Sequence, residues 1–323
     1  MGSFTYDIYL ATKLNQREVY GRELIRIAKE RDDIVVLTGD LAKSTKIDEF
    51  FETFPERSFN FGIAEQNMMG AAAGFAISGM IPVVSTLAVF ACLRVCEQIR
   101  TDIAYPNLKV IIVATHAGVS FGQAGPTHHC TEDLGIMRTM ANMCVVAPAD
   151  SIETAKALIS AIDRPGPVYI RIGRGFEPLV YENSDYKYRI GEAITIREGK
   201  DFTVIACGNT VSAAKTAADM LAKEGIDVRI INMHTIKPID KEVILKSANE
   251  TKFIITVEEH NIIGGLGSAV AEVLAEQGIG IKLHRLGLPD TYSVIGPAEE
   301  LYHKYLIDAD GIVKVARERW FKQ

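Results

Sequence analysis

The chain has 323 residues, of which 48% are hydrophobic and 24% are charged, a composition typical of a globular protein long enough for two domains. Its net charge is −6, and the 35 Lys and Arg residues are scattered among 41 acidic ones, which argues against a nucleic-acid or membrane surface as partner. No apolar run approaches the roughly 20 residues that span a bilayer, and the first residues, MGSFTYDIYLATKLNQ, lack a stretch of signal-peptide length. Five cysteines without a CxxC pair complete the expectation of a soluble, cytoplasmic protein with reduced thiols that acts on a small molecule.

In the first half, short β-branched runs alternate with helical patterns. The expected strands are DIVVLTGD, IPVVST, KVIIVATHAG, MCVVAPAD and GPVYIRIG. Several are apolar enough to be buried on both faces, which is typical of a parallel sheet covered by helices. Asp150 and Ser151 precede IETAKALISAI, where a side-chain oxygen can cap the start of a helix.

A polar stretch, FEPLVYENSDYKY, interrupts this alternation and predicts a linker at about residues 177–190. Strands and helices resume after it, from EAITIREG and DFTVIACGNT to KFIITVEEHN and IKLHRLGL. The sequence therefore predicts an α/β protein of two doubly wound domains, residues 1–180 with a mainly parallel sheet and a smaller domain over residues 190–323.

The most informative run is FGIAEQNMMGAAAGFA, in which Glu65 opens a helix of unusually small residues. Such a helix lets another backbone approach closely, and a carboxylate would then lie at the mouth of a packed interface. The plainer interpretation is an acidic residue that is favourable in the first turn of a helix. Three further runs bear on the choice: STLAVFACLR, THAGVSFGQAGPTHH and TVEEHNIIGGLGSAV.

Together these runs resemble the pyrimidine-binding and C-terminal domains of transketolases, and the likeness covers nearly the whole chain. It implies a transferase of aldehyde and ketone residues that uses thiamine diphosphate. In that family a glutamate hydrogen-bonds the aminopyrimidine ring, and Glu65 matches it. Burial favours the protonated form of a carboxyl group, which can hold a proton against the ring nitrogen, while the cofactor serves as the electron sink when a C–C bond breaks.

The resemblance assigns further cofactor contacts around Glu65. Phe90 matches the aromatic residue that stacks on the aminopyrimidine, although core packing is the simpler explanation for a lone phenylalanine. Leu87 and Leu93 stand where transketolases often carry further aromatic residues, which implies a more aliphatic pocket. Asp40, in LTGDLAKS, falls where the family places a carboxylate near the thiazolium; by itself it would be a turn residue.

The loop GQAGPTHHCTED presents two histidines before a helix expected to start at Cys130-Thr131. By resemblance, His128 contacts the reacting hydroxyl groups of the sugar and is catalytic, whereas His129 replaces a residue that is commonly glutamine. A metal site of His128, His129 and Cys130 is the rival interpretation, but three adjacent residues do not readily close a tetrahedral sphere. We therefore expect no metal ligands in this loop.

Four dispersed residues match the set that transketolases use for the terminal phosphate of the sugar: Arg17, Ser44, His116 and Arg174. The planar fork of arginine suits a tetrahedral oxyanion, although each residue alone is an ordinary polar one. One departure concerns the substrate. Many transketolases have Gly-Glu-Asp-Gly where this chain has Gln123 and Ala124 between its glycines, so we expect weaker selection at one hydroxyl-bearing carbon and leave the donor and acceptor sugars open.

No Gly-Asp-Gly start of a diphosphate-binding domain is found, and GNTVSAA and GGLGSAV do not complete a G-x-G-x-x-G motif. The resemblance therefore implies a separate N-terminal subunit that binds the diphosphate and Mg²⁺, in an α₂β₂ assembly, with this chain inactive alone. Three rival interpretations stay open: the β subunit of a 2-oxoacid dehydrogenase decarboxylase component, a deoxyxylulose-phosphate synthase, and a non-catalytic scaffold subunit.

Overall fold

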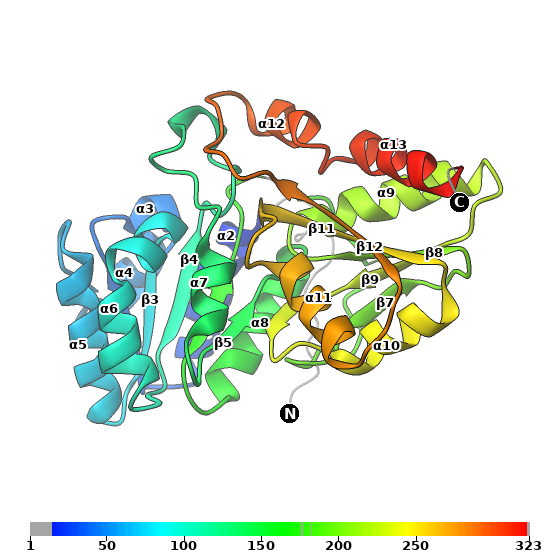
Figure 1. The fold of residues 1–323 in the computed structure, drawn as a ribbon. Coiled ribbons are helices and arrows are strands. Elements are labelled where there is room, and N and C mark those ends of the chain that lie inside the picture. Colours follow the sequence, from blue (N-terminus) through cyan, green and yellow to red (C-terminus); the bar gives the residue numbers. More distant parts are fainter. Residues whose placement is uncertain (1–14, 176, 182, 322–323) are drawn as a thin grey trace.

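The computed structural model describes residues 15–321 except residues 176 and 182, and it folds into two lobes, each built around a sheet (Figure 1). The first sheet has seven strands and the second has five. From edge to edge, the first runs β10 (Thr235–Lys237), β5 (Cys144–Val146), β6 (Val168–Arg171), β4 (Ile111–Thr115), β3 (Ile81–Leu87), β1 (Ile34–Thr38) and β2 (Ser58–Asn60). All neighbouring pairs are parallel except β10 with β5.

Every residue of β1, β3, β4 and β6 is buried, because helices cover both faces of this sheet. Alternate residues of each strand face opposite sides. One face packs on α2 (Gln16–Ala28), α4 (Asp48–Thr53) and α8 (Ser151–Asp163), and the other on α5 (Glu65–Ile77) and α7 (Asp133–Thr139). The short helices α3 (Ala42–Thr45) and α6 (Cys96–Gln98) complete this lobe.

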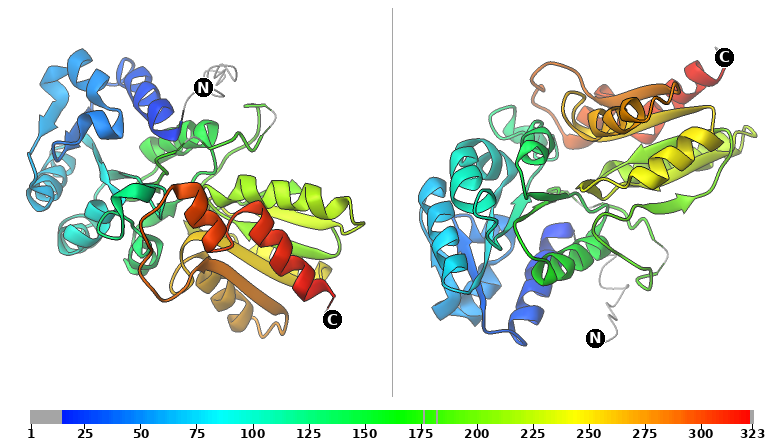
Figure 2. Two further views of the ribbon diagram at one scale, coloured as in Figure 1. Left: turned by 90° about the horizontal axis from the view of Figure 1, so that it is seen from above. Right: turned by 60° about the horizontal axis from the view of Figure 1, so that its bottom comes forward.

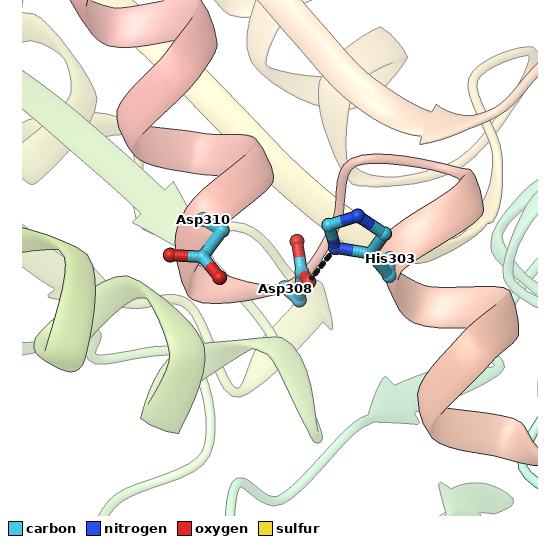
Figure 3. Close-up of side chains that lie close together, drawn as sticks. All are labelled: His303, Asp308 and Asp310. Atoms are coloured by element: carbon cyan, nitrogen blue, oxygen red, sulfur yellow. Dashed lines mark hydrogen bonds and ion pairs between the residues drawn. The ribbon is translucent and has the colours of Figure 1, made fainter.

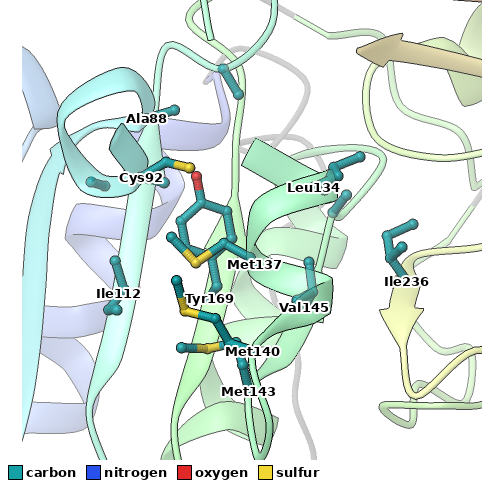
Figure 4. Close-up of a cluster of buried hydrophobic side chains, with 14 of the residues drawn as sticks. Ala88, Cys92, Ile112, Leu134, Met137, Met140, Met143, Val145, Tyr169 and Ile236 are labelled. Carbon is teal, nitrogen blue, oxygen red and sulfur yellow. The ribbon is translucent and has the colours of Figure 1, made fainter. Parts of the chain in front are cut away.

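The second face holds a methionine-rich part of the core. Met137, Met140 and Met143 lie around the ring of Tyr169, with Ile112 and Val145 on either side (Figure 4). Flexible thioether side chains suit irregular spaces of this kind. The same cluster of buried residues continues into the second lobe through Ile231 and Ile254, which lie on strands of the second sheet, so the two lobes share one continuous core.

The second sheet runs β12 (Lys282–Leu288), β11 (Phe253–Asn261), β8 (Phe202–Ala206), β9 (Val228–Asn232) and β7 (Ile194–Arg197), with β7 antiparallel to β9. Helices α9 (Thr210–Ala222) and α13 (Ala309–Trp320) cover one face, and α10 (Lys241–Glu250) and α11 (Leu266–Glu276) cover the other. Helix α12 (Ala298–Lys304) precedes α13. The two views of Figure 2 show the lobes packed side by side, with helices on both faces of each sheet.

The predicted fold class of two doubly wound α/β domains is confirmed, and several details differ. Asp150 caps α8, its carboxylate accepting from the Glu153 N–H at 2.8 Å, as the sequence predicts. Helix α7 begins at Asp133 rather than at Cys130-Thr131. Strand β10 was not expected: it lies in the second half of the chain but completes the first sheet, with Thr235 opposite Val146. Among the described helices, none is long and apolar enough to cross a membrane.

Candidate cofactor and substrate site

The candidate site lies where parallel strands of the first sheet end. Because β1, β3, β4 and β6 run in the same direction, the segments that follow them meet at one edge of the sheet. These segments carry Asp40, Phe90, His116 and Arg174, in that order along the chain. The structure therefore brings residues from four separate motifs to one edge.

Glu65 is the first residue of α5, and its side chain is almost fully buried. A negative charge is favourable at this position because the first turn of a helix exposes N–H groups. Gly39, just after β1, makes room for it: a Cβ atom at Gly39 would lie 3.3 Å from Glu65 Cγ and 3.1 Å from the Gly62 carbonyl oxygen. Glycine at this position therefore allows a close approach of Glu65 to the end of β1, where a larger residue would be crowded.

A π-helical turn, Phe90–Arg94, follows β3 and approaches Glu65. Arg94 Nη1 donates to Glu65 Oε2 at 2.8 Å, and Arg94 Cζ lies 4.0 Å from the centroid of the Phe90 ring. Of the two predicted aliphatic contacts, Leu87 is buried in the core of the lobe, whereas Leu93 is 48% exposed. Phe90 and Glu65 therefore flank the same planar cation, a contact that the sequence did not predict.

Asp40 follows Gly39, is exposed and is held in place by Asn60. The Asp40 N–H donates to Asn60 Oδ1 at 2.9 Å, and Asn60 Nδ2 donates to Asp40 Oδ1 at 3.2 Å. Asn60 Oδ1 also accepts from the Gly62 N–H at 3.0 Å. Asp40 has a positive φ of 62°, a conformation that costs energy for a non-glycine residue and is enriched at functional sites. Asn60 thus positions both Asp40 and the approach to α5.

The predicted anion-binding set converges although its members are distant in the sequence: Arg17, Ser44, His116 and Arg174. Arg17 Nη1 donates to the Ser44 carbonyl oxygen at 2.7 Å, and Arg17 Nη2 donates to the Arg174 carbonyl oxygen at 2.8 Å. Both terminal nitrogens of Arg17 therefore hold loops together, while the exposed Arg174 side chain lies with its Cζ 4.9 Å from the Phe121 ring centroid. In this arrangement Arg17 supports the set and Arg174 is the cation that faces solvent.

His116 is neutral near pH 7. Burial, followed by the charges of Arg17 and Arg174, lowers the pKa of His116 to about 3. Its Nε2 lies 3.4 Å from Arg17 Nη1, which can only donate, and its Nδ1 lies 2.8 Å from Thr115 Oγ1. The proton therefore resides on Nδ1, and the positive φ of 59° at His116 is a second strained position at this edge.

His128 lies between two aromatic rings, its centroid 5.7 Å from that of Phe90 and 5.8 Å from that of Phe121. This places it between the candidate cofactor residues and the anion-binding set. Its neighbour His129 is buried, and burial lowers the pKa of His129, whose Nε2 donates to the Gly122 carbonyl oxygen at 3.0 Å. His129 therefore fastens the loop. The sequence did not predict a role for Phe121.

A cleft of about 400 Å³ opens beside this loop. It is lined by Phe121, Gln123 and Arg174 on one side and by the start of α12, including Glu299, on the other. Both lobes thus contribute to the cleft into which Arg174 faces.

The second lobe also anchors the loop that carries His128. The buried Glu259 of β11 accepts from the Val119 N–H at 2.8 Å through Oε1 and from Asn209 Nδ2 at 3.0 Å through Oε2. Arg171 Nη2 donates to the Glu259 carbonyl oxygen at 2.7 Å. Burial raises the pKa of Glu259 to about 7. The run TVEEHN was part of the resemblance, but only the fold shows that it reaches the substrate loop.

Among the described residues, one further group could come together on a metal ion: His303, Asp308 and Asp310, at the junction of α12 and α13 (Figure 3). Asp308 already uses both oxygens, since Oδ2 lies 2.7 Å from His303 Nδ1 and Oδ1 accepts from the Gly311 N–H. It caps α13, where the helix dipole disfavours a cation. The group is therefore explained as a helix junction.

Comparisons with known proteins agree with this arrangement. The family model for the transketolase pyrimidine-binding domain matches residues 12–176, and that for the transketolase C-terminal domain matches residues 191–312. The chain belongs to the transketolase family. This confirms the predicted resemblance and the transferase class.

Two relatives that are similar over nearly their whole length are named as a section or a subunit of a transketolase. A putative transketolase C-terminal section of Methanocaldococcus jannaschii is 44% identical over 95% of this chain and 96% of its own length. One of the subunits of an apulose-4-phosphate transketolase of Phocaeicola vulgatus is 40% identical over 94% of this chain and 96% of that protein. These names do not favour the rival interpretation as a 2-oxoacid dehydrogenase subunit.

A solved structure described as a split gene transketolase, inactive beta4 tetramer, is 44% identical to this chain and has a TM-score of 0.85. The likeness covers 94% of this chain and 97% of that one. The inactive assembly named there consists of one kind of subunit.

The family implies thiamine diphosphate, and the residues at the sheet edge fit its aminopyrimidine ring. A planar, N–H-bearing group already lies between an aromatic ring and a buried carboxylate, as the Arg94 guanidinium does against Phe90 and Glu65. An aminopyrimidine is likewise planar and offers nitrogen atoms in its plane. Glu65 and Phe90 would hold that ring.

Proposed function

We propose that this chain is the catalytic half of a split transketolase that transfers a two-carbon ketol unit from a ketose with a terminal anion to an aldose. The observation that carries the proposal is the buried Glu65 at the carboxyl edge of the first sheet, next to Phe90, in a chain of the transketolase family. When bound, thiamine diphosphate would supply the electron sink for cleaving and forming the C–C bond.

The residues of this chain would divide the remaining work. Glu65 would hold a proton at the aminopyrimidine ring, and Phe90 would fix the plane of that ring. His128, between Phe90 and Phe121, would contact the reacting hydroxyl groups. Arg174 would bind the terminal anion of the sugar on the side of the cleft, with Arg17 keeping its backbone in place.

We further propose that a separate subunit completes the site, binding the diphosphate and Mg²⁺ in an α₂β₂ assembly. Exposed apolar side chains on and beside α5 support this, because Ile63 is 80% exposed, Ile77 74% and Leu93 48%. On α5, Gly70 and Gly74 have open space where a side chain would stand. An exposed apolar surface with a small-residue helix is typical of a protein interface. The neighbour described as an inactive tetramer of one kind of chain agrees with this need.

The sugar specificity is the finer part of the proposal. Ala124 stands at the sequence position where many transketolases have a carboxylate that orients a hydroxyl group, and its neighbour Gln123 lines the cleft. We infer that this chain accepts a ketose outside the ordinary pentose-phosphate set. A branched pentose phosphate or a sulfonated sugar would retain the terminal anion that Arg174 requires.

The test is to purify the chain alone and with its natural partner, and to screen phosphorylated, branched and sulfonated ketoses for two-carbon transfer to aldoses. The proposal predicts turnover that requires both subunits, thiamine diphosphate and Mg²⁺. Turnover by this chain alone would contradict the division of the site, and a reconstituted complex inactive on every ketose with a terminal anion would contradict the reaction.

A further inference from the structure

Arg94 makes the two contacts that the proposed function gives to the aminopyrimidine ring. Its guanidinium lies over the face of Phe90, 4.0 Å from Cζ to the ring centroid, and donates to Glu65 Oε2 at 2.8 Å. Glu65 is 1% exposed, so little room is left for a second partner at that carboxylate. A guanidinium is planar, stacks on aromatic faces and carries N–H groups in its plane, as an aminopyrimidine does.

We propose that the Arg94 side chain is a stand-in for the cofactor. It fills the aminopyrimidine half-site of the unassembled chain and must rotate out before thiamine diphosphate can bind. The inference rests on the proposed function, because it takes Glu65 and Phe90 as the cofactor contacts. It adds a residue that no motif assigned and gives the chain a closed state and an open state.

The position of Arg94 allows this movement. Its side chain is 40% exposed, and the residue ends the π-helical turn that begins at Phe90. The backbone is held separately, since Gln66 Nε2 donates to the Arg94 carbonyl oxygen at 3.1 Å. The long side chain can therefore rotate toward solvent while Phe90 and Glu65 stay in place.

The closed state also has a physical reason. A buried carboxylate without a counter-charge is unfavourable, and an exposed aromatic face invites non-specific contacts. Arg94 satisfies both groups until the partner and cofactor arrive. The consequence is that cofactor binding competes with an internal contact, so the apparent affinity is lower than that of the open site by the fraction of chains in the open state.

The test measures thiamine diphosphate affinity in the reconstituted complex with Mg²⁺, by calorimetric titration, for the Arg94→Ala and Arg94→Lys variants. Arg94→Ala removes one partly exposed ion pair and one cation–π contact that compete with the cofactor. Its apparent Kd for thiamine diphosphate should therefore be about 5- to 30-fold lower than that of the wild type. Arg94→Lys should fall between the wild type and Arg94→Ala, because an ammonium keeps the charge but loses the planar stack.

The matched control is Arg100→Ala, which removes an exposed arginine a short distance along the chain and should leave the Kd unchanged. A second readout is the thermal midpoint of the isolated chain. Arg94→Ala should lower it by a few degrees while tightening cofactor binding, and these opposite signs would not come from a residue that only supports the structure or binds the cofactor.

An unchanged or weaker Kd in Arg94→Ala would overturn the stand-in role. Glu65→Ala separates this result from failure of the proposed function. If cofactor binding depends on Glu65 but not on Arg94, only the stand-in role fails. If the wild type and Glu65→Ala bind thiamine diphosphate equally well, the cofactor assignment itself fails.

Discussion

Glu259 and its neighbour Glu258 offer a matched pair of perturbations in the second lobe. Both are buried on β11, and burial raises the pKa of each carboxyl group to about 7. Glu259 accepts from the Val119 N–H of the substrate loop and from Asn209, whereas Glu258 accepts from the Leu266 and Gly267 N–H groups that start α11. Glutamine at either position keeps the size and one acceptor but turns an N–H₂ toward a donor.

One buried donor then loses its partner in each variant, which costs about 1–3 kcal/mol. We expect Glu258→Gln and Glu259→Gln to lower the free energy of unfolding by similar amounts in this range, measured by urea denaturation of the isolated chain. Their kinetics in the reconstituted complex should differ. Only Glu259→Gln should reduce kcat/KM for the ketose, by about tenfold, because only its contact holds the loop that carries His128.

The comparison controls for stability, since both variants lose a similar buried interaction. Equal kinetics for the two variants would refute the anchoring role of Glu259. A Glu259→Gln complex with wild-type kcat/KM and reduced stability would show that the contact serves the fold alone.

Three further outcomes follow from the structure. Arg17→Lys should raise KM for a ketose with a terminal anion by about tenfold with little change in kcat. The reason is that one ammonium cannot replace both Arg17 Nη1, 2.7 Å from the Ser44 carbonyl oxygen, and Arg17 Nη2, 2.8 Å from the Arg174 carbonyl oxygen. An equal rise in KM for a ketose without the anion would contradict this prediction. Burial raises the pKa of Glu153 to about 7, above its ordinary value of 4.5, so its stabilising effect is full below about pH 4.5 and is lost as the pH rises through about 7. The urea midpoint of the wild type should therefore decrease as the pH is raised from 5 to 8, and that of Glu153→Gln should decrease less steeply. Equal slopes of midpoint against pH in the two proteins would refute the role given to Glu153. Ala124→Asp should change the ratio of kcat/KM values between ketose donors by about tenfold or more, and an unchanged ratio would show that position 124 does not select the sugar.

Much of the fold could be predicted because local patterns carried it. Apolar runs such as those of β1 and β4 are buried on both faces, as their composition indicated. The candidate site could be predicted in part for a similar reason: Asp40, Phe90 and His116 each follow a parallel strand, and the ends of parallel strands share one edge. The linker at about residues 177–190 and the individual site roles stay predictions.

The remaining features depend on contacts between distant parts of the chain. Strand β10 is three residues long and pairs with β5 from the other half, so no periodicity marks it. The contact of Arg94 with Glu65 joins residues 29 positions apart and depends on a π-helical turn. Glu259 reaches Val119 across 140 positions. Only the packing of the folded chain makes such pairs visible.

The central claim is that Glu65 activates a cofactor that this chain binds together with a partner. The most direct test is the turnover of the reconstituted complex with Glu65→Gln, which keeps the size of the side chain but removes the acid. Its matched control is Glu97→Gln, an exposed glutamate of α6. The account predicts a loss of about 10²–10⁴-fold in kcat for Glu65→Gln and none for Glu97→Gln. Turnover of Glu65→Gln within twofold of the wild type would contradict it.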